Sequence, residues 1–197
     1  MKFKGIELEG TYKVRCYATW FEVYDEKGNE IYHEKSNGFW GKWEYDEKGN
    51  VIYFEDSNGY WEKREYDEKG DMTYFENSNG FWEKWKYDEK GNVIYHEKSN
   101  GFWGKWEYDE KGNVIYFEDS NGYWAKREYN EKDNQSYYEC SKGYWEKSEY
   151  DEKGNVIYCE NSKGITIDKR EKELTIEEIE KLLGYKIKTK GETKWIR

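Results

Sequence analysis

The sequence predicts an all-β protein: an antiparallel meander of tandem β-hairpin repeats that forms an extended curved single sheet or hairpin solenoid, with a short C-terminal capping helix. Three observations predict this fold. Tyr-Asp pairs recur every 21 residues, two sets of glycines keep the same period, and these glycines alternate at spacings of 10 and 11 residues. A fixed period of this size is typical of repeat architectures, in which each unit packs only against its neighbours.

The repeats span residues 24–164 and form seven units. Six units begin with Tyr-Asp, and Tyr129-Asn130 begins the remaining one. Segments 24–65 and 87–128 match except that Glu30 corresponds to Val93 and Glu62 to Ala125. This similarity at an offset of 63 residues indicates an internal duplication of three units.

Each unit contains two turn signals. Asn58-Gly59 predicts a two-residue type I′ turn, which needs positive φ at both central residues. Asp46-Glu47-Lys48-Gly49 predicts a type I turn with Gly49 in the left-handed conformation. Strands of about six residues remain between the turns. Short connections at both ends make neighbouring strands antiparallel, so seven units predict about 14 strands. A closed barrel or shell is the main alternative.

The predicted two-residue turn decides which side chains share a face. It pairs Tyr53 with Arg64 and Val51 with Tyr66 on one face of the sheet. In other units Trp takes the place of Arg64, so rows of Tyr and Trp are expected there, and such rows suit cross-strand contacts. This face is the predicted partner-binding surface. Its predicted members are Trp43, Tyr53, Arg64, Tyr74, Trp85, Tyr95, Trp106 and Tyr116.

Aliphatic side chains are too few for an ordinary core. Only nine Ile, Leu and Val residues lie between Tyr24 and Gly164, whereas aromatic residues make up 20% of the chain. Burial in the repeats must therefore come from aromatic rings, helped by the stems of Lys, Arg and Glu. A two-layer sandwich would show a cleaner alternation of apolar and polar residues. A single sheet that is partly wet on both sides is therefore favoured over a sandwich.

The two ends differ from the repeats. Residues 1–23 are predicted to form an N-terminal capping strand region, and residues 165–197 a strand–helix–strand cap. Thr175 and Glu178 form a capping box that begins a helix, and Gly184 ends it. A strand is predicted over Tyr185–Thr189. The apolar side of the helix is expected to cover the last sheet edge, as terminal units of repeat proteins do, with a binding role as the alternative.

Composition excludes several classes of protein. No stretch approaches 18 apolar residues, so no membrane-spanning helix is expected. The first residues contain no apolar signal core, which predicts a cytoplasmic location. The three cysteines have no metal-like spacing and are expected to be free thiols: Cys16, Cys140 and Cys159.

The sequence contains no residue pattern that predicts catalysis, a metal or a cofactor. His33 and His96 occupy one repeat position where other units carry Phe, Tyr or Cys, which indicates a packing position. The acidic pairs, such as Asp46-Glu47, lie in turns and are expected to be solvated. The chain has no phosphate-binding glycine loop and no nucleophile elbow. We therefore expect a protein that is not an enzyme.

Tyr-Asp-x-x-Gly-Asn followed by Asn-Gly at a 21-residue period resembles the YD repeats of RHS-type proteins over residues 24–164. The form found here is also similar to small repeat proteins encoded by phages and prophages. That resemblance implies a small accessory protein in a bacterial host cell that antagonises host defence, in the manner of an anti-CRISPR protein.

Composition adds an expectation about the partner. The repeats carry a net charge of −13, because the −10 of the whole chain includes +1 from residues 1–23 and +2 from residues 165–197. Acidic repeats make direct nucleic-acid binding unfavourable and favour a protein with a basic surface, such as a nucleic-acid-handling complex. The prediction is a non-catalytic protein-binding inhibitor. Two alternatives are an aromatic-cage module for glycan or choline-type ligands and a structural repeat protein.

Overall fold

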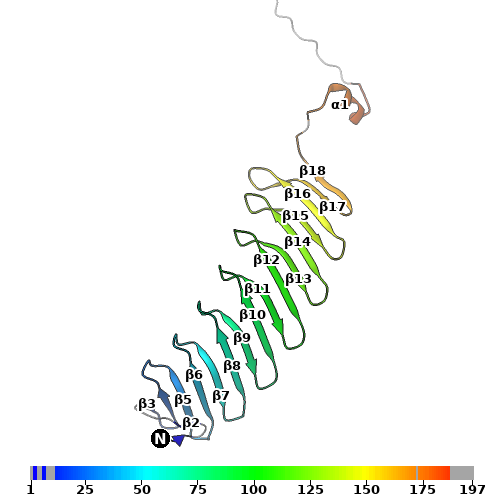
Figure 1. Ribbon diagram of the computed structural model, residues 1–197. Helices are drawn as coiled ribbons and strands as arrows, with labels where there is room; N and C mark the ends of the chain where they lie inside the picture. Colours follow the sequence, from blue (N-terminus) through cyan, green and yellow to red (C-terminus); the bar gives the residue numbers. More distant parts are fainter. Residues whose placement is uncertain (1, 4–5, 8–11, 172, 187–197) are drawn as a thin grey trace, which may run out of the picture.

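The computed structural model describes residues 2–3, 6–7, 12–171 and 173–186. It contains a 16-stranded antiparallel sheet in which every strand pairs with the next one along the chain (Figure 1). Substantial contacts between elements occur only between consecutive strands, so the sheet is a single open layer. The predicted fold class is confirmed, and the closed barrel or shell does not form. Among the described residues, no helix is long and apolar enough to cross a membrane.

The strands are short and of nearly uniform length. A separate two-stranded ladder is formed by β1 (Lys2–Phe3) and β2 (Ile6–Glu7). The large sheet begins with β3 (Lys13–Cys16) and β4 (Trp20–Tyr24) and ends with β18 (Gly164–Asp168). The strands between them are β5 (Glu30–Lys35), β6 (Trp40–Tyr45), β7 (Val51–Asp56), β8 (Trp61–Tyr66), β9 (Met72–Asn77), β10 (Trp82–Tyr87), β11 (Val93–Lys98), β12 (Trp103–Tyr108), β13 (Val114–Asp119), β14 (Trp124–Tyr129), β15 (Gln135–Cys140), β16 (Trp145–Tyr150) and β17 (Val156–Asn161).

The Asn-Gly turn differs from its prediction. The Asp56 N–H donates to the Tyr60 carbonyl at 2.9 Å and the Gly59 N–H to the Asp56 carbonyl at 3.0 Å, which makes a three-residue loop. Gly59 has φ 81°, but Asn58 is not left-handed, since Asp133 is the only described non-glycine residue with positive φ. The Asp56 carboxylate accepts the Asn58 N–H at 2.8 Å and the Tyr60 N–H at 3.2 Å. These side-chain bonds favour a type I turn followed by a left-handed glycine over the predicted type I′ turn.

This longer loop shifts the predicted register by one residue. Tyr53 lies opposite Lys63 and Phe54 opposite Glu62, whereas the sequence analysis paired Tyr53 with Arg64. Successive side chains of a strand point to opposite faces, so a one-residue shift moves one partner of each predicted pair to the other side. The eight residues predicted to share one face therefore divide between two faces.

The turn that begins each unit forms as predicted. The Gly49 N–H donates to the Asp46 carbonyl at 3.2 Å, and Gly49 has φ 90°. Next to it, Tyr45 pairs with Val51 and Glu44 with Tyr53, so one extra residue forms a β-bulge. The tyrosine of each later motif donates its hydroxyl to a carbonyl at the preceding bulge, as Tyr108 does to Val93 at 2.8 Å. The Tyr-Asp motif thus joins each unit to the one before it.

The C-terminal helix α1 (Ile176–Leu183) has the predicted ends. The Thr175 hydroxyl accepts the Glu178 N–H, the Glu178 carboxylate accepts the Thr175 N–H, and Gly184 is left-handed with φ 72°. The predicted cover of the last sheet edge does not form, because no residue of α1 is buried and Leu182 is 75% exposed. In Figure 1 the helix lies beyond β18, apart from the sheet. Of the strand predicted over Tyr185–Thr189, residues 187–189 lie outside the described residues, and Tyr185 and Lys186 are not in a strand.

Candidate functional site: two aromatic faces and a charged edge

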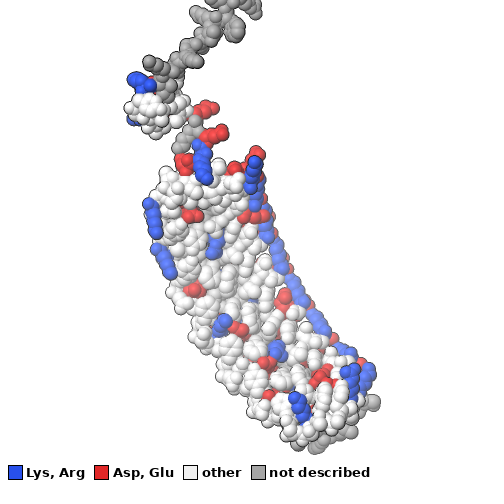
Figure 2. All heavy atoms as spheres, turned by 180° about the vertical axis from the view of Figure 1, so that it is seen from behind, with Lys and Arg blue, Asp and Glu red and all other residues white. Residues whose placement is uncertain are grey.

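The turns that begin the units line up along one long edge of the sheet, where Lys, Asp and Glu gather (Figure 2). In the turns that begin the first six units, a lysine reaches the backbone carbonyl of a glutamate 20 residues further on, as Lys27 does to Glu47 at 2.8 Å. We call these six lysines the lysine edge. They are Lys27, Lys48, Lys69, Lys90, Lys111 and Lys132.

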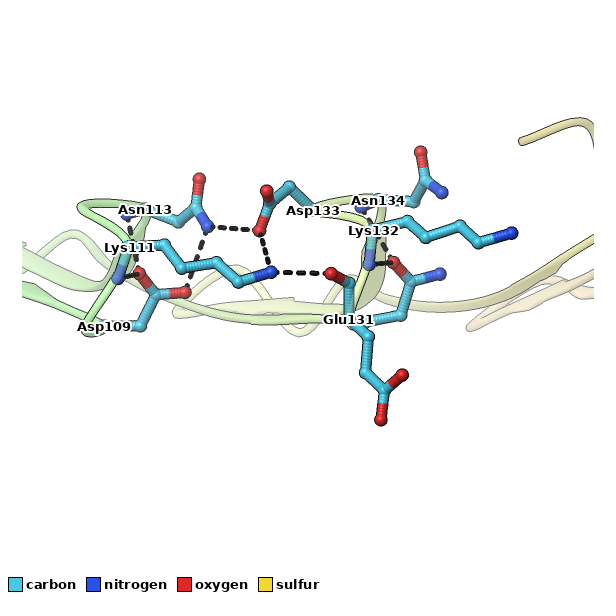
Figure 3. A network of polar contacts seen from close by, with 8 residues as sticks. Asp109, Lys111, Asn113, Glu131, Lys132, Asp133 and Asn134 are labelled. Atoms are coloured by element: carbon cyan, nitrogen blue, oxygen red, sulfur yellow. Dashed lines mark hydrogen bonds and ion pairs between the residues drawn. The ribbon is translucent and has the colours of Figure 1, made fainter. Parts of the chain in front are cut away.

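The lysine edge explains the one unit in which Asp133 replaces the turn glycine. Figure 3 shows the Asp133 carboxylate accepting from Lys111 Nζ at 2.9 Å and from Asn113 Nδ2 at 3.1 Å. Lys111 also donates to the Glu131 carbonyl at 2.6 Å. These contacts between units compensate for the positive φ of Asp133. The acidic residues of these turns were predicted to be solvated, and the contacts of the lysine edge were not predicted, although every unit carries a lysine at the same place.

Each turn aspartate is held ionised by its own loop. Asn113 Nδ2 donates to Asp109 Oδ2 at 3.0 Å, and the N–H groups of Lys111 and Asn113 donate to Oδ1 at 2.9 Å. The Asn113 side chain, with help from these backbone N–H groups, lowers the pKa of Asp109 below its ordinary value. These carboxylates are structural acceptors within their turns.

One face of the sheet, the Trp–Phe face, carries aromatic and guanidinium groups. Four predicted site residues lie here: Trp43, Arg64, Trp85 and Trp106. Trp43 contacts Phe54 with ring centroids 5.1 Å apart, Trp106 contacts Phe117 at 5.2 Å, and Trp85 stacks on His96 at 5.1 Å. Figure 2 shows one broad face of the molecule on which charged residues are few. His33 and His96 are ring-packing residues of this face, as predicted.

Two glycines on the Trp–Phe face accommodate the indoles. A Cβ atom on Gly104 would lie 2.6 Å from Cη2 of Trp106, and one on Gly41 would lie 3.0 Å from Cη2 of Trp43. Each indole therefore lies flat over the glycine two residues before it in the same strand. The unit that carries Arg127 in place of Trp has a fully buried Ala125 in place of glycine.

The opposite face, the Tyr–Glu face, holds the other four predicted site residues: Tyr53, Tyr74, Tyr95 and Tyr116. Two of these hydroxyls donate to the glutamate two residues on, at 3.0 Å from Tyr53 to Glu55 and at 3.1 Å from Tyr116 to Glu118. Burial, that hydrogen bond and the charges of Glu55 and Glu44 raise the pKa of Tyr53 to about 12. These tyrosines stay protonated near neutral pH.

Lysines cover the indoles of the Tyr–Glu face. Lys84 Nζ lies 5.0 Å from the Trp82 ring centroid, and Lys105 lies at the same distance from Trp103. Such contacts are cation–π interactions. The indoles of this face are therefore partly occupied by groups of the chain itself.

A row of charged residues runs along the Tyr–Glu face, one per unit, each opposite a tyrosine in the register. We call it the Glu row. Its members are Glu44, Glu65, Lys86, Glu107, Glu128 and Glu149. All six are exposed. Glu149 pairs with Arg170 at 3.2 Å. Within residues 12–171 and 173–186, the carboxylates of Glu44, Glu65, Glu107 and Glu128 make no hydrogen bond or ion pair.

Shallow hollows lie beside this row. One of about 650 Å³ is lined by Tyr74 and Tyr95 with Lys84, Lys86, Glu65 and Glu97. A second, of about 480 Å³, is lined by Tyr116 and Tyr137 with Lys126, Glu107 and Glu128. The second hollow occupies the same place two units later, with Glu128 where the first has Lys86. In the described part of the chain, no group of three or more His, Cys, Asp and Glu side chains could hold a metal ion.

Comparison with known proteins adds matches to solved structures. A chain of the Photorhabdus luminescens Tc holotoxin pore carrying the TccC3-D651A mutation matches over 73% of this chain and 9% of that one, with 15% identity and a TM-score of 0.47. A chain of the TcdB2-TccC3-Cdc42 structure matches with the same values, and one of TcdB2-TccC3 with 17% identity and a TM-score of 0.41. No protein-family model matches the sequence, and no curated protein matches it. This chain therefore spans about a tenth of the length of the solved chains that it resembles, over its tandem β-hairpins.

Proposed function

We propose that this chain is a non-catalytic protein-binding scaffold whose Tyr–Glu face docks against a basic protein. The observation that carries the proposal is the Glu row, with four exposed carboxylates that make no hydrogen bond or ion pair in the described part of the chain. Unpaired carboxylates at a regular spacing are available to Lys and Arg of a partner, and the neighbouring tyrosines are typical of interface hot spots.

The partner class follows from charge. Proteins that bind nucleic acid expose Lys and Arg toward phosphates, so an acidic strip can occupy the same groove. We propose a nucleic-acid-handling complex of a bacterial host, blocked by occupation of its basic groove, as the finer form of this function. A choline-type aromatic cage is less favoured, because Lys84 and Lys105 already lie over Trp82 and Trp103.

The test is capture of a partner from bacterial lysate with three forms of the chain. The first is wild type, the second replaces Glu44, Glu65, Glu107 and Glu128 with Gln, and the third carries Trp85→Ala and Trp106→Ala on the opposite face. All three are checked for retained strand content by circular dichroism. We expect one stoichiometric basic protein that the Gln variant loses and the Trp variant retains.

The same partner then serves in an activity assay. Wild type should inhibit its nucleic-acid binding, and rising salt should slow association because charge steering is screened. Loss of binding in the Trp variant together with retention in the Gln variant would place the interface on the Trp–Phe face and overturn the proposal.

A further inference from the structure

A repetitive surface gives a partner several equivalent positions one unit apart. Neighbouring members of the Glu row lie two strands apart, which is about 9.6 Å at the usual strand spacing. If every member were glutamate, a basic partner could slide by one unit with little change in energy. A feature that occurs once along the row would remove this degeneracy.

Lys86 is that feature. It stands opposite Tyr95 in the same register in which Glu65 stands opposite Tyr74 and Glu107 opposite Tyr116. It is exposed, and its ammonium lies 5.7 Å from the Tyr95 ring centroid. Within the residues that the structure describes, neither Lys86 nor its neighbour Lys84 forms an ion pair, whereas the equivalent Lys105 pairs with Glu118 at 3.0 Å.

The two lysines share one hollow with Tyr74 and Tyr95. Glu65 and Glu97 also line this hollow. At the equivalent hollow two units later, Glu128 stands in the place of Lys86, so Lys126 is the one lysine among its lining residues, beside Arg127, Glu107 and Glu128. In the described part of the chain, the hollow at Lys86 is the place along the row where two ammonium groups lie together, and neither forms an ion pair with the Glu65 or Glu97 carboxylate that also lines it. An acidic side chain of a partner is the complementary group for the exposed Lys86 ammonium.

We propose that Lys86 fixes the register of the partner, and that the partner presents two basic groups, one acidic group and two basic groups at steps of about 9.6 Å. The acidic group enters the hollow between Tyr74 and Tyr95, and the basic groups meet Glu44, Glu65, Glu107 and Glu128. This inference rests on the proposed function and names the charge pattern that its partner must carry.

Polyproline II peptides provide a matched probe. They rise about 3.1 Å per residue with three residues per turn, so every third side chain lies on one side at steps of about 9.3 Å. Probe one is (Lys-Pro-Pro)2-Glu-Pro-Pro-(Lys-Pro-Pro)2, and probe two has Lys in place of its Glu. Both are titrated at low salt against wild type and against Lys86→Glu, which restores the repeat consensus at an exposed position and leaves the Trp–Phe face unchanged.

We expect wild type to prefer probe one and Lys86→Glu to prefer probe two, each by about two- to fivefold, the range of one exposed ion pair. If both proteins bind both probes and Lys86→Glu shows the same preference between the probes as wild type, the register inference is wrong and the proposed binding function is retained. No binding of either probe to either protein would overturn the proposal that the Glu row binds basic groups, and the register inference with it.

Discussion

Replacement of Gly104 by alanine tests whether glycine is required under the indole. The added Cβ would lie 2.6 Å from Cη2 of Trp106 and 3.1 Å from Cζ2 and Cζ3, far inside contact distance. The indole must then lift away from the strand, which loosens its contact with Phe117, whose centroid lies 5.2 Å away. Backbone strain plays no part, because the φ of Gly104 is not positive.

The expected cost combines two opposing effects. Overpacking a well-packed site costs about 1–3 kcal/mol. Removing a glycine from a strand returns about 0.5–1 kcal/mol of conformational entropy. The net destabilisation should be about 1–2 kcal/mol, and it should be smaller for Gly41→Ala, where the closest indole atom lies at 3.0 Å.

The chain itself supplies the compensating change. Ala125 is fully buried two residues before Arg127, so alanine fits where the indole is absent. We therefore expect Trp106→Arg to remove most of the cost of Gly104→Ala, which a double-mutant cycle measures as a coupling energy. Hydrogen exchange is the suitable assay, because a linear array opens locally, and the loss should be concentrated in β12 and β13. A stabilising Gly104→Ala with no coupling to Trp106 would refute the packing argument.

Two further predictions concern acid stability and shape. The pKa of Asp109 is lowered in the fold by Asn113 and by backbone N–H groups, so its stabilising contribution is present above the unfolded value near 4 and is lost as pH falls through the folded pKa. The midpoint temperature of thermal unfolding should therefore decrease when the pH is lowered below about 4. The decrease should be smaller in Asp109→Asn, because Asn130 holds the equivalent turn of another unit with an amide. An unchanged pH profile in that variant would contradict this prediction. Sixteen strands spaced by about 4.8 Å form a strip about 72 Å long, which predicts a radius of gyration of about 21 Å in small-angle scattering. A compact chain of this length would have a radius of gyration of about 16 Å, and a measured value near 16 Å would exclude the open sheet in solution.

The repeat made the fold predictable because its information is local. Each unit contains its own turns, and the Gly49 turn follows from its residues alone. Short connections between strands then leave an antiparallel meander as the simple solution. The helix ends at Thr175 and Gly184 were equally readable, since a capping box and a C-terminal glycine act within one turn of chain.

The candidate site was less predictable because it depends on register. The turn at Asn58-Gly59 was correctly placed but one residue too short in the prediction, since the Asp56 side chain stabilises a different loop. That single residue separated Trp43, Arg64, Trp85 and Trp106 from the tyrosines. The lysine edge was not predicted for a related reason. Each lysine and the glutamate carbonyl that it contacts lie 20 residues apart in the sequence and meet only when neighbouring units pair in the sheet.

By itself, the sequence determined the period, the strands, the positions of the turns and the acidic character of the repeats, all properties of single units or of composition. Only the tertiary structure decided which side chains share a face, which carboxylates of the Glu row lack a partner, and that α1 leaves its apolar side uncovered. The physical reason is the two-residue period of a strand. A shift of one residue costs little in local turn energy, but it moves every side chain of that strand to the other face of the sheet.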